Sequence, residues 1–189
     1  DTVEIGTTYE VGPFELEWIA VNNAIADSCA LSIHTKEGTV IYTSSFKLDQ
    51  TPVDGKVFDI KRLSQIGDKG VLALISDSAG VENTGYTPSE KAVKDRLLRE
   101  VSEAKGRVFV VFPGTNTHRL QILFDIAKES GKKMHLLGAS LLKTALAAVV
   151  TGHLNYDRAV EASLEEMNSL ADDKQIIVAS GIEDDPMHV

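Results

Sequence analysis

The chain has 189 residues, of which 43% are hydrophobic, so it is long and apolar enough to form one domain or two small ones. Its formal net charge of −9 argues against a broad basic surface for nucleic acid, although a local basic pocket stays compatible with it. The single cysteine, Cys29, excludes an internal disulfide framework and indicates a reducing compartment, so we expect a cytoplasmic location.

The sequence shows no apolar run of membrane-spanning length and no signal peptide, so we expect no membrane association. Residue 1 is Asp, which predicts that the natural start is missing or was removed. We therefore expect a fragment or a processed piece.

The first part of the chain, residues 1–56, has the pattern of β structure. Residues 14–21 begin with period-two alternation and become fully apolar. Residues 29–34 and 39–43 form two further strands, and the turn signal at 35–38 joins them as a hairpin. A short helix over 59–66 is expected to end at Gly67.

From residue 70 onward, short apolar strands alternate with helical patterns, which predicts βαβ units and a parallel sheet. The strands are 71–75, 108–112, 134–137 and 175–179. One helix is announced by a capping box at 87–90. A second helix is capped by Thr115 or Thr117 and ends at Gly131. The patterns at 141–150 and 156–170 indicate two more. The apolar strand 108–112 is predicted to be central and covered on both faces. A domain boundary is expected near residues 80–90.

Small polar residues, glycines and one arginine follow the predicted parallel strands. Because ligands bind beyond the carboxyl ends of such strands, these residues predict a crevice for phosphate, with Arg119 as the best phosphate contact. The ordinary alternative is that βα turns need Gly, Ser, Thr and Asp for capping. The four strand ends are 76–78, 114–119, 138–140 and 180–181.

Several segments resemble those of one protein family, in the same order. Thr115-Asn-Thr-His-Arg-Leu-Gln121 resembles the Ser-Asn-(Ile/Val/Thr)-His-Arg-(Ile/Leu/Val)-Gln motif of the β-CASP ribonucleases, and of ribonuclease J in particular. Segments 46–53, 74–78, 85–90 and 180–187 resemble further ribonuclease J segments. The resemblance implies an α/β protein in which residues 1–85 are part of a metallo-β-lactamase αββα sandwich. Residues 86–189 would then form a Rossmann-like, parallel-sheet β-CASP domain.

The resemblance also implies a two-zinc ribonuclease site, and this chain departs from it. Asn23 stands where the family has a zinc-ligating His, and Ser45 stands where it has a bridging Asp. Ser44 replaces a family Gly, and Ala26 replaces a family Pro. We therefore expect no metal in this chain and interpret it as a degenerate, metal-free relative.

The remaining site residues keep two interpretations each. Asp77 and His118 occupy family positions near the chemistry, but Asp77 also fits a turn cap, and His118 fits a bond to its neighbours. Arg119 fits either a phosphate or an ion pair with a carboxylate. The residues that we expect to bind phosphate or RNA are Asn116, Thr117, His118, Arg119, Ser180 and Gly181.

Three functions fit this pattern. The first is a non-catalytic ribonuclease J-like subunit or fragment that docks on a protein partner, such as an active paralogue or a second copy. The second is an active zinc-dependent exo- and endoribonuclease whose other ligands lie outside this chain. The third is a module that binds RNA or nucleotide phosphate without cutting it.

Overall fold

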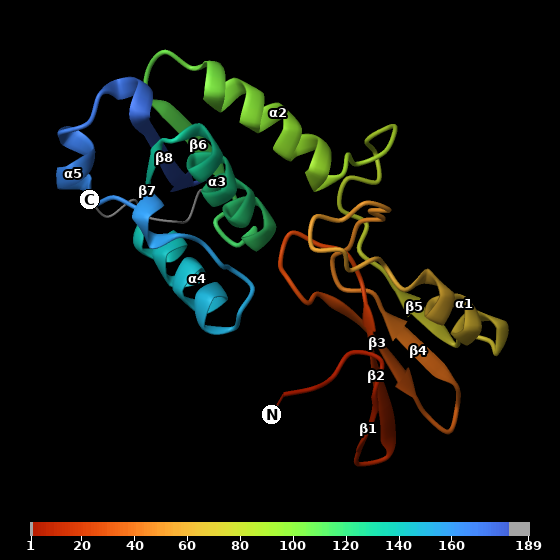
Figure 1. Cartoon of the computed structure of the whole chain (residues 1–189). Coiled ribbons are helices and arrows are strands. Elements are labelled where there is room, and N and C mark those ends of the chain that lie inside the picture. The colour runs from red at the N-terminus through yellow and green to blue at the C-terminus, as the bar shows by residue number, and fades with distance from the viewer. Residues whose placement is uncertain (1, 182–189) are drawn as a thin grey trace. The chain divides into compact units, whose positions relative to one another are not determined.

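The computed structural model describes residues 2–181, and residues 182–187 of the segment that begins at Ser180 lie outside the described part. It divides into two compact units that meet in sequence between Ser89 and Glu90 (Figure 1). The α/β class expected from the sequence is confirmed. None of the described helices is long and apolar enough to span a membrane.

The first unit contains a five-stranded sheet. Its strands follow the order β1 (Thr8–Val11), β2 (Phe14–Ala20), β3 (Cys29–His34), β4 (Thr39–Tyr42) and β5 (Ala73–Ile75). The first four strands pair antiparallel, and β5 runs parallel to β4. The predicted β3–β4 hairpin is confirmed, because Thr35 and Gly38 close its turn with backbone hydrogen bonds.

One face of this sheet forms the core of the first unit. Helix α1 (Ile60–Asp68) buries Ile66 against Ile19, Ala30 and Ile41. The Asp59 side chain caps α1 by accepting from the backbone N–H of Arg62. The expected helix end at Gly67 is wrong, because the helix continues through Asp68 and its C-cap is Lys69.

The opposite face of the first sheet is also apolar, but no helix among the described residues of this unit packs on it. Leu16 pairs with Ile33, and Trp18 pairs with Leu31, so their side chains share that face. All four are only half-buried. Trp18 meets Tyr9 edge to face, with 5.5 Å between the ring centroids.

The second unit contains a three-stranded parallel sheet with the order β6 (Val108–Phe112), β8 (Gln175–Ser180), β7 (Lys133–Leu137). The prediction that 108–112 is the central, doubly covered strand is wrong. Strand β8 is central and buried from Gln175 to Ala179, whereas β6 lies at an edge of this sheet. Phe109 and Val111 of β6 are each 64% exposed. A uniformly apolar strand therefore has one open face.

Three helices pack on the other face of this sheet. They are α2 (Glu90–Glu103), α3 (Thr117–Ser130) and α4 (Ala139–Val150). Val101 of α2, Leu123 of α3 and Leu141 of α4 join one core with Ile176 and Val178 of β8. The predicted end of α3 is confirmed, because Gly131 adopts a left-handed conformation with φ 63°.

The predicted continuous helix over 156–170 is wrong. The structure has two short 3₁₀ turns, η1 (Arg158–Val160) and η2 (Asp172–Lys174), and a short helix, α5 (Leu164–Asn168). The chain between η1 and α5 is extended, because Ala162 donates its N–H to the carbonyl of Met134 at the edge of β7. Ser163 and Glu166 then form a capping box that starts α5.

Candidate functional site

The carboxyl edge of the second sheet is formed by Gly114, Asn116, Gly138 and Ser180. Gly114 and Asn116 follow β6, Gly138 follows β7, and Ser180 ends β8. A Cβ atom on Gly114 would lie 3.1 Å from Ser180 Oγ and 3.5 Å from Leu141 Cδ1 of α4. The first turn of α4 and the end of β8 therefore meet the turn that leads into α3, as the sequence predicted for parallel strands.

Asn116 is the residue that starts α3. Its side chain accepts a hydrogen bond from the backbone N–H of Arg119 at 2.9 Å, so the expected cap at Thr115 or Thr117 is wrong. Asn116 and Thr117 are both buried, and His118 is half-buried. The Asn116 carbonyl oxygen is thus committed to the helix rather than directed to solvent.

Arg119 forms an ion pair with Glu90, the first residue of α2. Nη2 lies 2.9 Å from Oε1 and 3.0 Å from Oε2, and Nε lies 3.3 Å from Oε2. The side chain of Glu90 is only 9% exposed, and that of Arg119 is 25% exposed. The carboxylate alternative for Arg119 is therefore realised, and the pair joins the first turns of α2 and α3.

Ser180 and Gly181 lie beside this turn. Ser180 Oγ is buried and has no hydrogen-bond partner among residues 2–181. The Gly181 N–H donates to the carbonyl of Phe112 at 3.0 Å, which continues the β6–β8 pairing by one residue. The first turn of α4 also lacks a side-chain cap, because its N-cap is Gly138. A buried hydroxyl and an uncapped helix start thus lie at one edge.

Asp77 lies in the first unit, after β5. Its backbone N–H donates to Thr43 Oγ1 at 3.1 Å, and its Oδ1 accepts from the Ala79 N–H at 2.9 Å. These contacts match the turn-capping alternative. Asp77 belongs to the first unit and His118 to the second.

Asn23 and Ser45, which occupy the family's ligand positions, lie together in the first unit. The Asn23 amide donates from Nδ2 to the carbonyl oxygen of Ser45 at 2.9 Å, and its Oδ1 accepts from the Ala24 N–H. The Asn23 amide N–H thus points a hydrogen toward Ser45, whereas a metal ligand would have to offer a lone pair. Ser44, next to Ser45, has φ 55°, a conformation that favours glycine.

These side chains do not fit a pair of zinc ions. Zinc ligands in proteins are thiolates, imidazoles and carboxylates, and Asn23 and Ser45 supply none of them. In the described part of the chain, no group of three or more His, Cys, Asp or Glu side chains could hold a metal ion.

Comparison with known proteins shows which family the chain resembles. The sequence profile of the ribonuclease J β-CASP domain matches residues 105–189. The chain is also 36% identical over 174 residues to a ribonuclease J from Synechocystis and 38% identical over 177 residues to one from Thermus thermophilus. The chain is ribonuclease J-like. These alignments cover 92% and 93% of the chain but only 27% and 30% of the two relatives.

A solved structure supports the fold of this ribonuclease J-like chain. A protein of unknown function from Enterococcus faecalis superposes with a TM-score of 0.58 and 16% sequence identity. The superposition covers 96% of this chain and 44% of that protein. At this identity the likeness concerns the fold alone.

Gln121, the last residue of the ribonuclease J-like motif, has a role that the sequence did not reveal. Its Nε2 donates to Asp125 Oδ1 and to the Asn155 carbonyl, both at 2.9 Å, and its Oε1 accepts from the Asn155 N–H at 2.8 Å. Gln121 of α3 thereby holds the loop that follows α4 against α3. The motif showed that a polar residue was present, but its main partner lies 34 residues further along the chain.

Proposed function

We propose that this ribonuclease J-like chain is a non-catalytic part of an RNA-processing or RNA-decay protein. The observation that carries the proposal is the hydrogen bond from the Asn23 amide to the Ser45 carbonyl at the two family ligand positions. A zinc-bound hydroxide is the nucleophile that such a two-metal site would supply. Asn23 and Ser45 supply neither ligand, and within residues 2–181 no cluster of three or more His, Cys, Asp or Glu side chains takes their place.

We further propose that residues 1–85 are part of a metallo-β-lactamase sandwich and that residues 86–189 form the β-CASP domain. The apolar, half-buried face of the first sheet supports the sandwich, because such a face is stable when a second sheet covers it. The open faces also favour a protein partner, either a ribonuclease J paralogue or a second copy. The single cysteine supports a location in the cytoplasm.

The partner that we propose for the carboxyl edge is an RNA phosphate. Three features support this assignment: the first turn of α3, the uncapped first turn of α4, and the buried Ser180 hydroxyl without a described partner. Backbone N–H groups in a helix's first turn attract anions. Thr117, His118 and Gly181 border the same edge. Arg119 acts by holding α3 in place, because Glu90 already occupies its guanidinium.

The proposal predicts RNA binding without cleavage. The purified chain should bind single-stranded RNA with salt-dependent affinity and should leave 5′-monophosphorylated RNA intact when zinc is added. Ser180→Ala should weaken RNA binding and leave the folded state unchanged. Zinc-dependent cleavage would contradict the non-catalytic role. RNA binding that is unchanged by Ser180→Ala would contradict the phosphate site.

A further inference from the structure

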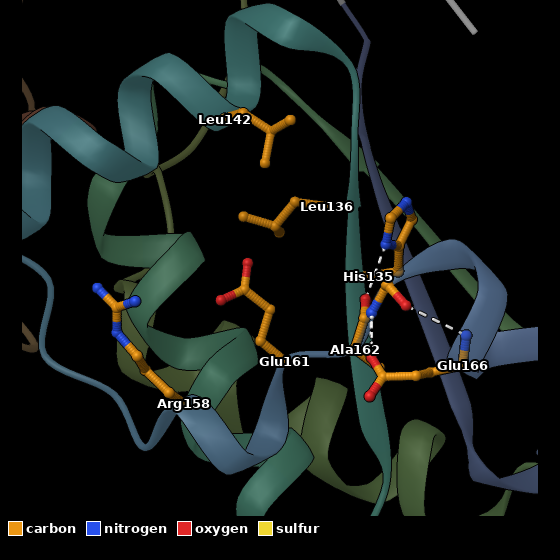
Figure 2. A pocket seen from close by; sticks show the side chains of 8 residues that line it. His135, Leu136, Leu142, Arg158, Glu161, Ala162 and Glu166 are labelled. Carbon is orange, nitrogen blue, oxygen red and sulfur yellow. Dashed lines mark hydrogen bonds between the residues drawn. The ribbon is translucent and has the colours of Figure 1, made fainter.

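A pocket of about 440 Å³ lies beside β7 in the second unit (Figure 2). Leu136 of β7 and Leu142 of α4 supply its apolar wall, and Arg158, Glu161 and Glu166 supply its charged groups. Leu142 is 47% exposed, so the wall is accessible from outside. The volume lies in the range of small-ligand pockets, and no residue of the carboxyl edge lines it.

The pocket forms because the segment after η1 runs alongside β7 for only a short distance. Ala162 donates its N–H to the Met134 carbonyl at 2.9 Å, and His135 Nδ1 donates to the Ala162 carbonyl at 2.9 Å. The capping box of Ser163 then turns the chain into α5. The edge of β7 beyond Met134 is therefore left open at Leu136, between walls that are fixed by hydrogen bonds.

Glu161 has a fixed orientation in the pocket. Its Oε2 accepts a hydrogen bond from the Tyr156 hydroxyl at 2.9 Å, and the Tyr156 ring stacks on Phe124 with 3.7 Å between the centroids. Burial and the hydrogen bond to Glu161 raise the pKa of Tyr156, so its hydroxyl keeps the donated proton. The Glu161 carboxylate is thus a positioned acceptor rather than a mobile surface charge.

Arg158 lies one turn before Glu161, and Figure 2 shows both side chains on the same side of β7 as Leu136 and Leu142. Within residues 2–181, no hydrogen bond or ion pair holds the Arg158 guanidinium. A planar cation, a fixed carboxylate and an apolar wall are therefore presented together. Figure 2 also shows that His135 is turned away toward the Ala162 carbonyl.

We propose that this pocket is a base-selective subsite for a nucleobase with an exocyclic amine, which belongs to single-stranded RNA. The base lies against Leu142 and stacks on the Arg158 guanidinium, and its amine donates to Glu161. Splayed-out RNA bases are recognised in this way, by stacking on guanidinium planes and by hydrogen bonds at their edges. This inference rests on the proposed role in RNA binding and adds a sequence preference to it.

The carboxylate gives the subsite its selectivity. Cytosine, adenine and guanine each present an amine hydrogen to an acceptor such as Glu161. Uracil has no amine, and it flanks its only ring N–H with carbonyl oxygens that would face the carboxylate. The subsite therefore discriminates against uracil, whereas the phosphate contacts at the carboxyl edge are independent of base identity.

The test compares short oligocytidylate with oligouridylate of the same length, titrated into the full chain at fixed salt. The two probes carry the same phosphate charge, so the carboxyl edge should bind them with equal affinity. We expect oligocytidylate to bind about tenfold more tightly. Free cytidine and uridine, titrated separately, distinguish a subsite that takes a lone nucleoside from one that needs the RNA strand.

Three variants assign this preference to the pocket. Glu161→Gln keeps an oxygen for the Tyr156 hydroxyl but loses the carboxylate, so the preference should fall to about onefold. Arg158→Ala should weaken both probes similarly. Glu165→Gln removes the same charge from an exposed position on α5 that does not line the pocket, and it should leave the ratio unchanged.

Each outcome decides between the two proposals. Binding of both probes without a preference overturns the base subsite and leaves the RNA-binding role intact. A preference that survives Glu161→Gln also overturns the subsite. If neither probe binds, both the subsite and the proposed RNA-binding role are wrong. A preference that Glu161→Gln removes and Glu165→Gln retains supports the subsite.

Discussion

At the carboxyl edge of the second sheet, Gly114 and Asn116 each have a physical reason for their identity, whereas Asn23 and Ser45 of the first unit contact each other's polar groups and neighbouring backbone. Gly114 leaves space for Ser180, and Asn116 caps α3. In the first unit, Asn23 and Ser45 are joined by a hydrogen bond that needs neither a metal nor a carboxylate. The second unit therefore offers backbone N–H groups at an uncapped helix start, whereas Asn23 and Ser45 supply no zinc ligands.

The largest effect should come from breaking the ion pair behind the carboxyl edge. Arg119→Ala removes the ion pair of the buried Glu90 carboxylate with Arg119, and we expect a loss of about 3–5 kcal/mol in the free energy of unfolding. Chemical denaturation monitored by circular dichroism measures this change. The matched control is Arg96→Ala, which breaks an exposed pair with Glu100 and should have no measurable effect. Equal effects of the two substitutions would show that the Glu90 pair has no special structural role.

A second buried pair, in the first unit, predicts a pH dependence. Arg62 donates to Glu17 at 2.6 and 2.7 Å, and its hydrogen bonds lower the pKa of Glu17 below the ordinary value of 4.5. The stabilisation is therefore present above pH 4.5 and is lost as the pH falls through the lowered folded-state pKa.

The corresponding variant tests that sign. Arg62→Ala should cost about 3 kcal/mol at neutral pH, and the difference from the parent chain should shrink as the pH falls and Glu17 becomes protonated. Unfolding curves at several pH values between neutrality and the acid range measure it. A difference that is independent of pH would mean that packing by the Arg62 side chain, not its charge, stabilises the unit.

A smaller effect is expected where Gly114 meets Ser180. Gly114→Ala places a Cβ atom 3.1 Å from Ser180 Oγ, so the edge must shift, at a cost of about 1–3 kcal/mol. RNA affinity should fall at the same time, because Ser180 moves relative to the helix starts. Gly106→Ala is the matched control, since a Cβ atom there meets nothing within 4 Å. Filter binding and thermal denaturation of both variants distinguish the two sites.

The smallest effect should be a gain in stability at Ser44 of the first unit. Ser44 adopts φ 55°, which costs an L-amino acid about 1 kcal/mol relative to glycine. Ser44→Gly should therefore raise the free energy of unfolding by about 1 kcal/mol without conferring zinc binding. A loss of stability in this variant would show that the extra freedom of glycine in the unfolded chain outweighs the relieved backbone strain.

Local signals in the sequence were sufficient for much of the fold. The β3–β4 hairpin and the end of α3 at Gly131 depend on residues close together in the chain, and these predictions are confirmed. The capping box predicted at 87–90 would start α2 at Pro88, but the helix starts at Glu90. The α1 boundary was misplaced because a glycine in the last turn of a helix resembles a stop signal.

Contacts between distant segments could not be predicted in the same way. The central place of β8 depends on pairing with β6, more than 60 residues earlier. The extended chain before α5 depends on the bridge from Glu161 to Met134. The sequence pattern of one segment does not show which distant segment pairs with it. The position of β6 at the edge of the sheet and the interruption of the helix predicted over 156–170 were therefore both missed.

The sequence predicted where the residues of the candidate site lie, but not the contacts that they form. The sequence placed Asn116, Arg119 and Ser180 at one edge of the sheet, and the structure brings their segments together. It did not reveal that Glu90 binds Arg119, because several carboxylates were available as partners. The pocket at Leu136 and Glu161 was also missed, since it forms only where the predicted helix gives way to an extended segment.

The measurement that most directly tests the account is the zinc content of the longest natural form of the protein that contains residues 1–189. Elemental analysis after dialysis against zinc, with RNA cleavage assayed on the same sample, measures it. We predict no stoichiometric zinc and no cleavage, because Asn23 and Ser45 supply no zinc ligands. Two zinc ions per chain together with cleavage would contradict it and would show that other residues have replaced the family ligands.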